Sequence, residues 1–332
     1  MKRTVIGLVI GLIIVGIALL GVSSPIRIGI TKIVEHPALD AVEKGVIDAL
    51  TAAGYVEGVD VEYLLASAQG DMGNAVSIAQ NFRSQGVDLV VAIATPSAQA
   101  VVEAFRGSSV PVIYGAVTDP VGANLVPSAT DPSGNGNVTG VSDMIPVAAH
   151  LQLLKDLAPD IAKIGIVYNP GEANSAILTD MAKAAAPDLG LQIVTATADS
   201  TANVPIAAQS LVGRVDAFYV TTDNTVVSAI DSVLAASQEA GVPFLMADPT
   251  SLPNATLVAG FDYYEHGLTV GEVVLKVLSG TSPDEIPVTY QSTAEVELNL
   301  DEAARIGLRF PQSVIDQASA ILYGGVIWER KD

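Results

Sequence analysis

Two stretches of the chain repeat each other, and this repeat constrains the fold more than any other feature. The first runs from Asn74 to Pro120 and the second from Asn203 to Thr250. Each reads as a helix, a strand opening on Val-Asp, a turn with threonine, a second helix, a Val-Pro strand and an Asp-Pro turn. Strand-length apolar runs that alternate with helical patterns are typical of parallel sheets covered by helices. The sequence therefore predicts two similar α/β halves, and a cleft between such halves is a common place for a small ligand.

The repeat also limits how the rest of the chain can be divided. The repeated units occupy residues 26–120 and 161–250, so the chain beyond residue 256 has to be shared between the halves. We predict an α/β fold of two Rossmann-like lobes with parallel sheets, in which the chain returns to the first lobe and then ends in the second. The predicted divisions are 1–24 for a leader, 25–143 plus about 259–290 for lobe 1, and 144–258 plus about 291–332 for lobe 2.

This division makes the chain pass between the lobes repeatedly. The predicted crossings lie near residues 141–146, 256–262 and 290–294. A connection of several parallel segments can bend as a hinge without disturbing either core. We therefore expect the ligand cleft at the hinge.

Residues 1–24 are predicted to be a signal peptide or an N-terminal membrane anchor. Lys2 and Arg3 precede an uncharged run from Val5 to Val22, which is long for the core of a signal peptide and near the lower limit for a membrane span. The sequence leaves open cleavage after Ser23, a retained anchor, and a buried helix of a cytoplasmic protein. In the first two cases the positive N-terminus stays inside. We expect an extracytoplasmic protein, in the periplasm or on the outer face of the cytoplasmic membrane.

Charge and missing residue types argue against several functions. A net charge of −20 repels nucleic acid and anionic membrane surfaces, so we expect no nucleic-acid partner. The absence of cysteine excludes disulfides, thiolate metal sites, a cysteine nucleophile and a lipid-modified cysteine. The three histidines form no zinc-type pair, and no nucleophile elbow or Walker loop is present. We expect no metal, no cofactor and no enzymatic activity; an α/β enzyme would need an acid–base set that the sequence does not display.

Polar loops follow the predicted strands, at the sheet edge where open α/β folds bind ligands. Thr95, Pro96 and Ser97 read either as a helix cap alone or as a seat for a ligand carboxylate, made of free N–H groups and a hydroxyl. The equivalent turn of the second repeat holds Asp223 and Asn224. Asp223 reads either as a cap or as the acceptor of a ligand ammonium group, with Asn224 helping to orient it.

The local strings in and around these loops are more specific than the general pattern. They include EHPALDAVEKGVIDAL, AIATPSAQA, VTDPVGANLV, GNVTGVSDM, IGIVYNPGEANS, VDAFYVTTDN and GFDYYEHGLTVGEVVLKVLSG. In content and order, over about residues 26–300, they resemble the ABC-transporter solute-binding family related to tryptophan and tyrosine uptake. The resemblance implies a type I periplasmic-binding fold that closes on its ligand, an aromatic amino acid. It also implies delivery to a membrane permease powered by a separate ATPase.

The resemblance places the ligand-binding residues in the loops around the cleft. Carried over by motif, they are Glu35, His36, Thr95, Pro96, Ser97, Thr118, Asp119, Asn174, Ser175, Asp223, Asn224 and Asp262. A zwitterion needs donors for its carboxylate and an acid for its ammonium group, since buried charge is tolerated only when it is paired. These loops supply both.

The expected function is therefore that of the extracytoplasmic solute-binding component of an ABC importer. The alternative is a membrane-associated ligand sensor of the same fold without transport, although the chain carries no kinase, methyl-accepting or DNA-binding segment. Two features depart from the family. The cysteine that begins many mature members is absent, and the tail Phe310–Asp332 runs past the matching part. That tail is either an extra strand on one lobe or a segment for docking.

Overall fold

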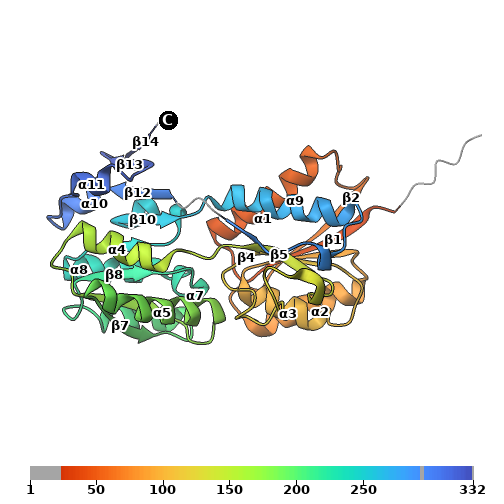
Figure 1. Cartoon of the computed structure of the whole chain (residues 1–332), viewed down its shortest axis with the longest axis horizontal. Helices are drawn as coiled ribbons and strands as arrows, with labels where there is room; N and C mark the ends of the chain where they lie inside the picture. Colours follow the sequence, from red (N-terminus) through yellow and green to blue (C-terminus); the bar gives the residue numbers. More distant parts are fainter. Residues whose placement is uncertain (1–23, 292–294, 331–332) are drawn as a thin grey trace, which may run out of the picture.

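The structure, a computed structural model, describes residues 24–291 and 295–330 and shows two lobes side by side (Figure 1). Each lobe is built on one β-sheet with helices on both faces, so the predicted two-lobed α/β architecture is confirmed. The leader predicted for residues 1–24 lies, apart from Ser24, outside the described residues. Within the described part, no helix is both long and apolar enough to cross a membrane.

The sheet of lobe 1 is parallel throughout, in the order β11-β5-β4-β3-β1-β2. Strands β3 and β4 are buried along their whole length, as expected for a sheet covered on both faces. Helices α1 and α9 pack together on one face, and α2 and α3 on the other (Figure 1). The strands are β1 (Ile26–Lys32), β2 (Val61–Ser67), β3 (Leu89–Ile93), β4 (Val112–Val117), β5 (Val138–Ser142) and β11 (Thr289–Tyr290). The helices are α1 (Pro37–Ala52), α2 (Met72–Gln85), α3 (Thr95–Ala104) and α9 (Tyr263–Leu278).

The sheet of lobe 2 has the order β14-β13-β12-β10-β9-β8-β6-β7. Helices α4 and α5 pack over one hydrophobic cluster and α6 and α8 over another, on the opposite face. The strands are β6 (Lys163–Tyr168), β7 (Gln192–Thr197), β8 (Ala217–Val220), β9 (Phe244–Met246), β10 (Leu257–Gly260), β12 (Glu295–Asn299), β13 (Ala320–Tyr323) and β14 (Val326–Glu329). The helices are α4 (Val147–Leu157), α5 (Ala173–Ala185), α6 (Val204–Gln209), α7 (Asn224–Val227), α8 (Ile230–Ala240), α10 (Leu300–Arg305) and α11 (Gln312–Ile315). Short 3₁₀ turns lie at Pro132–Gly134, Ala186–Leu189, Thr201–Asn203, Pro249–Asn254 and Pro283–Glu285.

Lobe 2 departs from the predicted parallel sheet at its C-terminal strands. Strand β12 is antiparallel to β10, with Gly260 opposite Glu295, and β14 is antiparallel to β13. The chain returns from lobe 1 beside the carboxyl end of β10, so β12 has to run away from the hinge. An antiparallel pair needs no crossover helix. The tail left open by the sequence forms β13 and β14, which extend this sheet.

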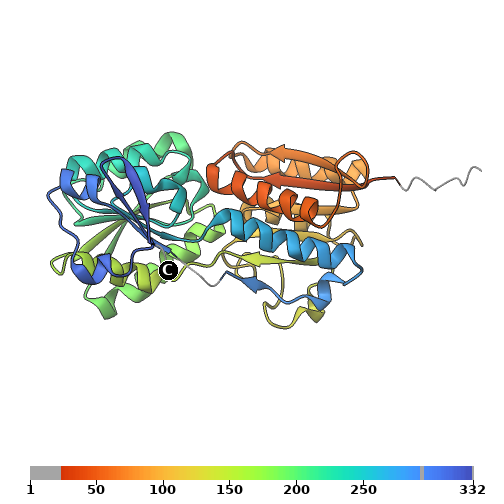
Figure 2. The same cartoon turned by 90° about the horizontal axis from the view of Figure 1, so that it is seen from above.

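Within the described residues the chain passes between the two sheets from β5 to α4 and from β10 to α9 (Figure 2), and β11 and β12 belong to different sheets. The second passage leads directly into α9, which begins at Tyr263. Helix α9 contacts α1 so closely that only glycine fits at the contact. A Cβ atom at Gly45 would lie 2.5 Å from the carbonyl oxygen of Tyr264, and one at Gly267 would lie 2.4 Å from that of Val42. The helix that follows the hinge is therefore fixed to lobe 1 by direct backbone packing.

Candidate functional site

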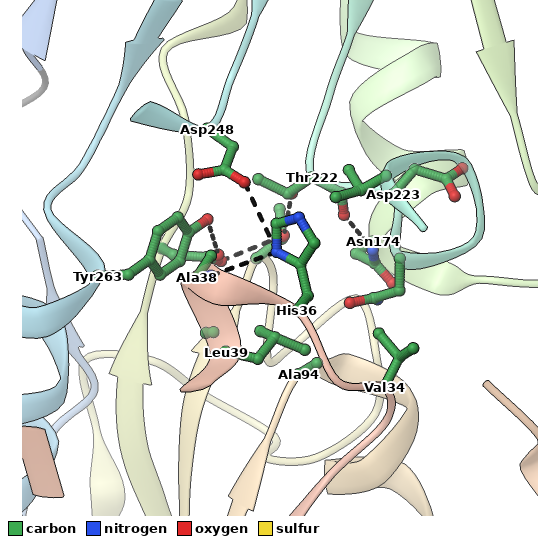
Figure 3. Close-up of a pocket in the computed structure, with 15 residues that line it drawn as sticks. Val34, His36, Ala38, Leu39, Ala94, Asn174, Thr222, Asp223, Asp248 and Tyr263 are labelled. Atoms are coloured by element: carbon green, nitrogen blue, oxygen red, sulfur yellow. Dashed lines mark hydrogen bonds and ion pairs between the residues drawn. The ribbon is translucent and has the colours of Figure 1, made fainter. Parts of the chain in front are cut away.

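A cavity of about 450 Å³, counted to its open mouth, lies between the lobes at the carboxyl ends of both sheets (Figure 3). Its walls combine residues of both lobes, and they carry carboxylates, hydroxyls, amides and short apolar side chains. The lining residues are Val34, His36, Ala38, Leu39, Ala94, Ala116, Thr118, Asp143, Asn174, Thr222, Asp223, Asn224, Val227, Asp248 and Tyr263.

The structure brings several of the residues predicted from the sequence together on this cavity. His36, Thr118, Asn174, Asp223 and Asn224 all line it. They come from loops of different strands, His36 and Thr118 from lobe 1 and the other three from lobe 2. The lobes also touch here, because the hydroxyl oxygens of Thr118 and Thr222 are 3.3 Å apart.

Three predicted residues lie elsewhere and have other partners. Glu35 pairs with Lys32 at 2.9 Å, and its side chain is half exposed. Asp119 accepts hydrogen bonds from the backbone N–H groups of the turn that follows it, at 2.9 and 3.1 Å. Asp262 caps α9, accepting from the N–H groups of its first turn at 2.7 and 3.1 Å. The structure does not place these three on the cavity.

The predicted carboxylate seat, Thr95 to Ser97, forms the first turn of α3. The Thr95 and Ser97 side chains are buried, and within the described part of the chain their hydroxyls have no hydrogen-bond partner. Pro96 lines a second, larger cavity that shares Val34 and Asn224 with the first. Ala94, directly before the helix, lines the first cavity with a φ of 73°, a left-handed conformation that is costly for alanine. This first turn therefore lies at the edge of both cavities, with unused donors.

Asp223 lines the cavity, but its oxygens are occupied within lobe 2. One accepts from the N–H of Val226 at 2.9 Å; the other accepts from the N–H of Asn169 at 2.6 Å and from the Ser175 hydroxyl. The predicted residue Ser175 thus contacts Asp223. Burial, followed by the charge of Glu172, raises the pKa of Asp223 to about 6. Of the two roles that the sequence left open, the observed contacts are those of a cap.

Asp223→Ala is expected to destabilise the ligand-free protein. The change leaves three hydrogen-bond donors in a buried region without an acceptor. We therefore expect a loss of about 2 kcal/mol in the free energy of unfolding, measured by urea denaturation. Asp71→Ala is the control, because Asp71 is an exposed cap that accepts one N–H bond, from Asn74 at 2.8 Å. Its expected loss is about 1 kcal/mol. A smaller loss at Asp223 than at Asp71 would contradict the capping role.

Three titratable lining residues were not in the predicted set: Asp143, Asp248 and Tyr263. Asp143 follows β5 and accepts hydrogen bonds from the hydroxyls of Tyr263 at 3.1 Å and Thr118 at 3.3 Å. Burial raises its pKa to about 6. The sequence held only weak signals for two of them: Asp143 is the next-to-last residue of the string GNVTGVSDM, and Asp248 is the counterpart of Asp119 in the repeat.

Asp248 of lobe 2 faces His36 of lobe 1 across the cavity, with 3.7 Å between Oδ2 and Nδ1 (Figure 3). His36 also caps α1, where Nδ1 accepts from the N–H of Ala38 at 3.3 Å. A nitrogen that accepts this bond carries no proton, so it cannot donate to Asp248 at the same time. Burial lowers the pKa of His36 and raises that of Asp248. At neutral pH the imidazole is therefore uncharged and does not neutralise Asp248.

The charges of the lining residues define what the cavity can bind. Among the described residues that line it, Asp143, Asp223 and Asp248 are acids, and none is lysine or arginine. A buried carboxylate needs a cation or several donors. The cavity therefore favours a ligand with a positively charged group.

Comparisons with known proteins identify the family of this chain. The model of a family described as ABC transporter substrate binding protein matches residues 27–322. A protein of Clostridioides difficile called tyrosine-binding protein is 40% identical over 276 residues, 83% of this chain and 79% of that protein. A solved ABC domain from Streptococcus pneumonia in complex with L-Trp is 32% identical, with a TM-score of 0.85 over 90% of this chain and all of that one. A ligand-free, open substrate-binding protein with adhesive properties from Clostridium difficile is 35% identical, with a TM-score of 0.67 over 89% of this chain and 98% of that one.

Proposed function

Because this chain belongs to the ABC transporter substrate-binding protein family, we propose that it captures an aromatic amino acid by closure of its two lobes and delivers it for import. Members of this family bind solutes and are not enzymes, and they act outside the cytoplasm. The observation that carries the proposal is the acidic cavity between the lobes. The relatives named for tyrosine and for an L-Trp complex support the choice of cargo.

We assign the ammonium group of the ligand to Asp143 and Asp248. Both line the cavity, and the two side-chain bonds that Asp143 accepts come from hydroxyls and are longer than 3 Å, so it keeps acceptor capacity. Asp248 accepts from Thr250 and faces an uncharged imidazole. Asp223, the acceptor that the sequence suggested, is less suitable because N–H and hydroxyl groups of lobe 2 occupy both of its oxygens.

The ligand carboxylate is assigned to the first turn of α3. Free N–H groups at a helix start favour an anion. The unpartnered hydroxyls of Thr95 and Ser97 lie in this turn, and Ala94 reaches the cavity. A zwitterion held in this way would contact an acid at one end and donors at the other, without any basic side chain.

Lobe closure is supported by contacts across the cleft and by the two solved relatives. Thr118 meets Thr222, and His36 approaches Asp248, from opposite lobes. At similar sequence identity, the TM-score is 0.85 to the L-Trp complex and 0.67 to the open, ligand-free protein. This difference supports the proposal that the lobes close on a ligand.

The partners that we propose are an ABC permease and its separate ATPase, with the predicted leader exporting or anchoring the chain. The sensor alternative is not proposed, because the family match is to components of transporters.

A thermal-shift screen of the full chain tests the cargo. We expect L-tryptophan or L-tyrosine to raise the melting temperature, since a ligand at a hundred times its Kd adds about 2.7 kcal/mol of stability. Sugars, nucleosides and short peptides serve as controls and should leave it unchanged. A rise with one of these classes, and none with amino acids, would contradict the aromatic cargo while keeping a role in solute binding.

A further inference from the structure

A buried hydrogen bond joins two of the passages between the lobes. Asp143 lies in the passage from β5 to α4, and Tyr263 begins α9 at the end of the passage from β10. The Tyr263 hydroxyl donates to Oδ2 of Asp143 at 3.1 Å, and both residues are more than nine-tenths buried. Segments far apart in the sequence are thus tied together beside the cavity.

The same carboxylate continues this connection across the cleft. Oδ1 of Asp143 accepts from the hydroxyl of Thr118 at 3.3 Å, and that hydroxyl lies 3.3 Å from the hydroxyl of Thr222 in lobe 2. If Thr118 donates its proton to Asp143, Thr222 can donate to Thr118. A line of hydrogen bonds therefore runs from the hinge, along the cavity wall, to the opposite lobe.

We propose that Tyr263 is a positioning residue, which holds the Asp143 carboxylate in place for the ligand's ammonium group and ties that contact to the hinge. The inference rests on the proposed function. Tyr263 is suited to this role because α9 is fixed against α1 by the glycine contact, so the hydroxyl is carried by a rigid element. Burial raises the pKa of Tyr263 well above 10, so the hydroxyl keeps its proton and always donates.

The electrostatics give Tyr263 a pH signature. Burial raises the pKa of Asp143 to about 6, while the bonds from Tyr263 and Thr118 oppose that rise. The other titratable groups that line the cavity are His36 before α1, Asp223 after β8 and Asp248 after β9. Removing the Tyr263 hydroxyl leaves them unchanged and raises the pKa of Asp143 further. The carboxylate is then protonated at a higher pH, and a cationic group loses its partner there.

The test compares Tyr263→Phe with Tyr264→Phe in the full chain. Tyr264 is the matched control, because its hydroxyl also donates to an aspartate, Asp48 at 2.9 Å. Unlike Tyr263 and Asp143, Tyr264 and Asp48 do not line the cavity. The Kd for L-tryptophan is measured by calorimetry from pH 5 to pH 8. We expect Tyr263→Phe to weaken binding about tenfold at pH 7. We also expect the midpoint, the pH at which half of the affinity is lost on acidification, to rise by about one unit in Tyr263→Phe. Tyr264→Phe should match the wild type.

Each outcome bears on the proposal. A Tyr263→Phe variant that binds as the wild type does, or that is weaker by the same factor at every pH, overturns it. Thr118→Val, which removes the other donor to Asp143, should move the midpoint in the same direction, and it provides a second variant if Tyr263→Phe folds poorly. A wild-type chain that binds no aromatic amino acid overturns the proposed function and this inference with it. Wild-type binding with an unmoved midpoint in both variants overturns the inference alone.

Discussion

Asp143→Asn is expected to abolish tight binding of the amino acid and, at the same time, to stabilise the ligand-free protein. The amide keeps the shape of the side chain and removes its charge. Losing one partner of a buried charge pair costs about 2 to 5 kcal/mol, so the Kd should rise at least about 30-fold. This change tests directly whether Asp143 receives the ammonium group.

The gain in stability follows from the raised pKa of Asp143. Burial moves that pKa from 3.8 to about 6, so the folded protein holds a proton that the unfolded chain releases. The free energy of unfolding of the wild type therefore falls as the pH rises from 4 to about 6, and the loss is complete above pH 6. The shift in the pKa of Asp143 corresponds to a loss of about 3 kcal/mol in the free energy of unfolding. We expect a gain of about 1 to 2 kcal/mol at pH 7, because the amide nitrogen cannot accept the bonds from Tyr263 or Thr118.

Urea denaturation at pH 4, 5 and 7, together with calorimetry of L-tryptophan binding, measures both effects. The control is Asp88→Asn, since Asp88 is exposed at the opposite edge of the lobe 1 sheet, where it accepts from the N–H of Arg27 at 2.8 Å. That variant should bind as the wild type does. A stable Asp143→Asn variant with unchanged affinity would contradict the ammonium assignment. A gain in stability that is the same at all three pH values would contradict the raised pKa.

The sequence predicted the fold well where its pattern was periodic. The repeat correctly indicated two α/β lobes, because strand-length apolar runs followed by helices leave few alternatives to a parallel sheet. The direction of β12 and β14 could not be predicted in the same way. A short strand reads the same in either direction, and β12 is antiparallel only because the chain re-enters lobe 2 at the hinge end of β10.

The candidate site was harder to predict from the sequence than the fold, because the same residue types cap helices and bind ligands. Asp223 and Asp262 each precede a helix, and both accept N–H bonds from its first turn. Asp143 caps no helix, and its carboxylate accepts bonds from the hydroxyls of Tyr263 and Thr118 and lines the cavity. Which acid remains free to bind a ligand depends on contacts between segments far apart in the chain, and a single sequence does not display these contacts.

Gly267→Ala is expected to destabilise the protein strongly, against the ordinary preference of a helix. Alanine normally stabilises a helix interior by about 1 kcal/mol relative to glycine. At Gly267, however, the new Cβ atom would lie 2.4 Å from the carbonyl oxygen of Val42, 2.9 Å from its Cα and 3.0 Å from the Cα of Gly45. All three are backbone atoms of α1, so the clash can be relieved only by moving α9 away from it.

We expect the free energy of unfolding of Gly267→Ala to fall by about 4 kcal/mol, above the usual range for overpacking because no side chain can yield. Urea denaturation measures it, and Glu272→Ala, at an exposed position of the same helix, should change stability by less than about 0.5 kcal/mol. Movement of α9 would also displace Tyr263, so ligand affinity should fall together with stability. A Gly267→Ala variant as stable as Glu272→Ala would show that α1 and α9 can separate at little cost, and α9 would then not be the rigid element on which the positioning of Asp143 depends.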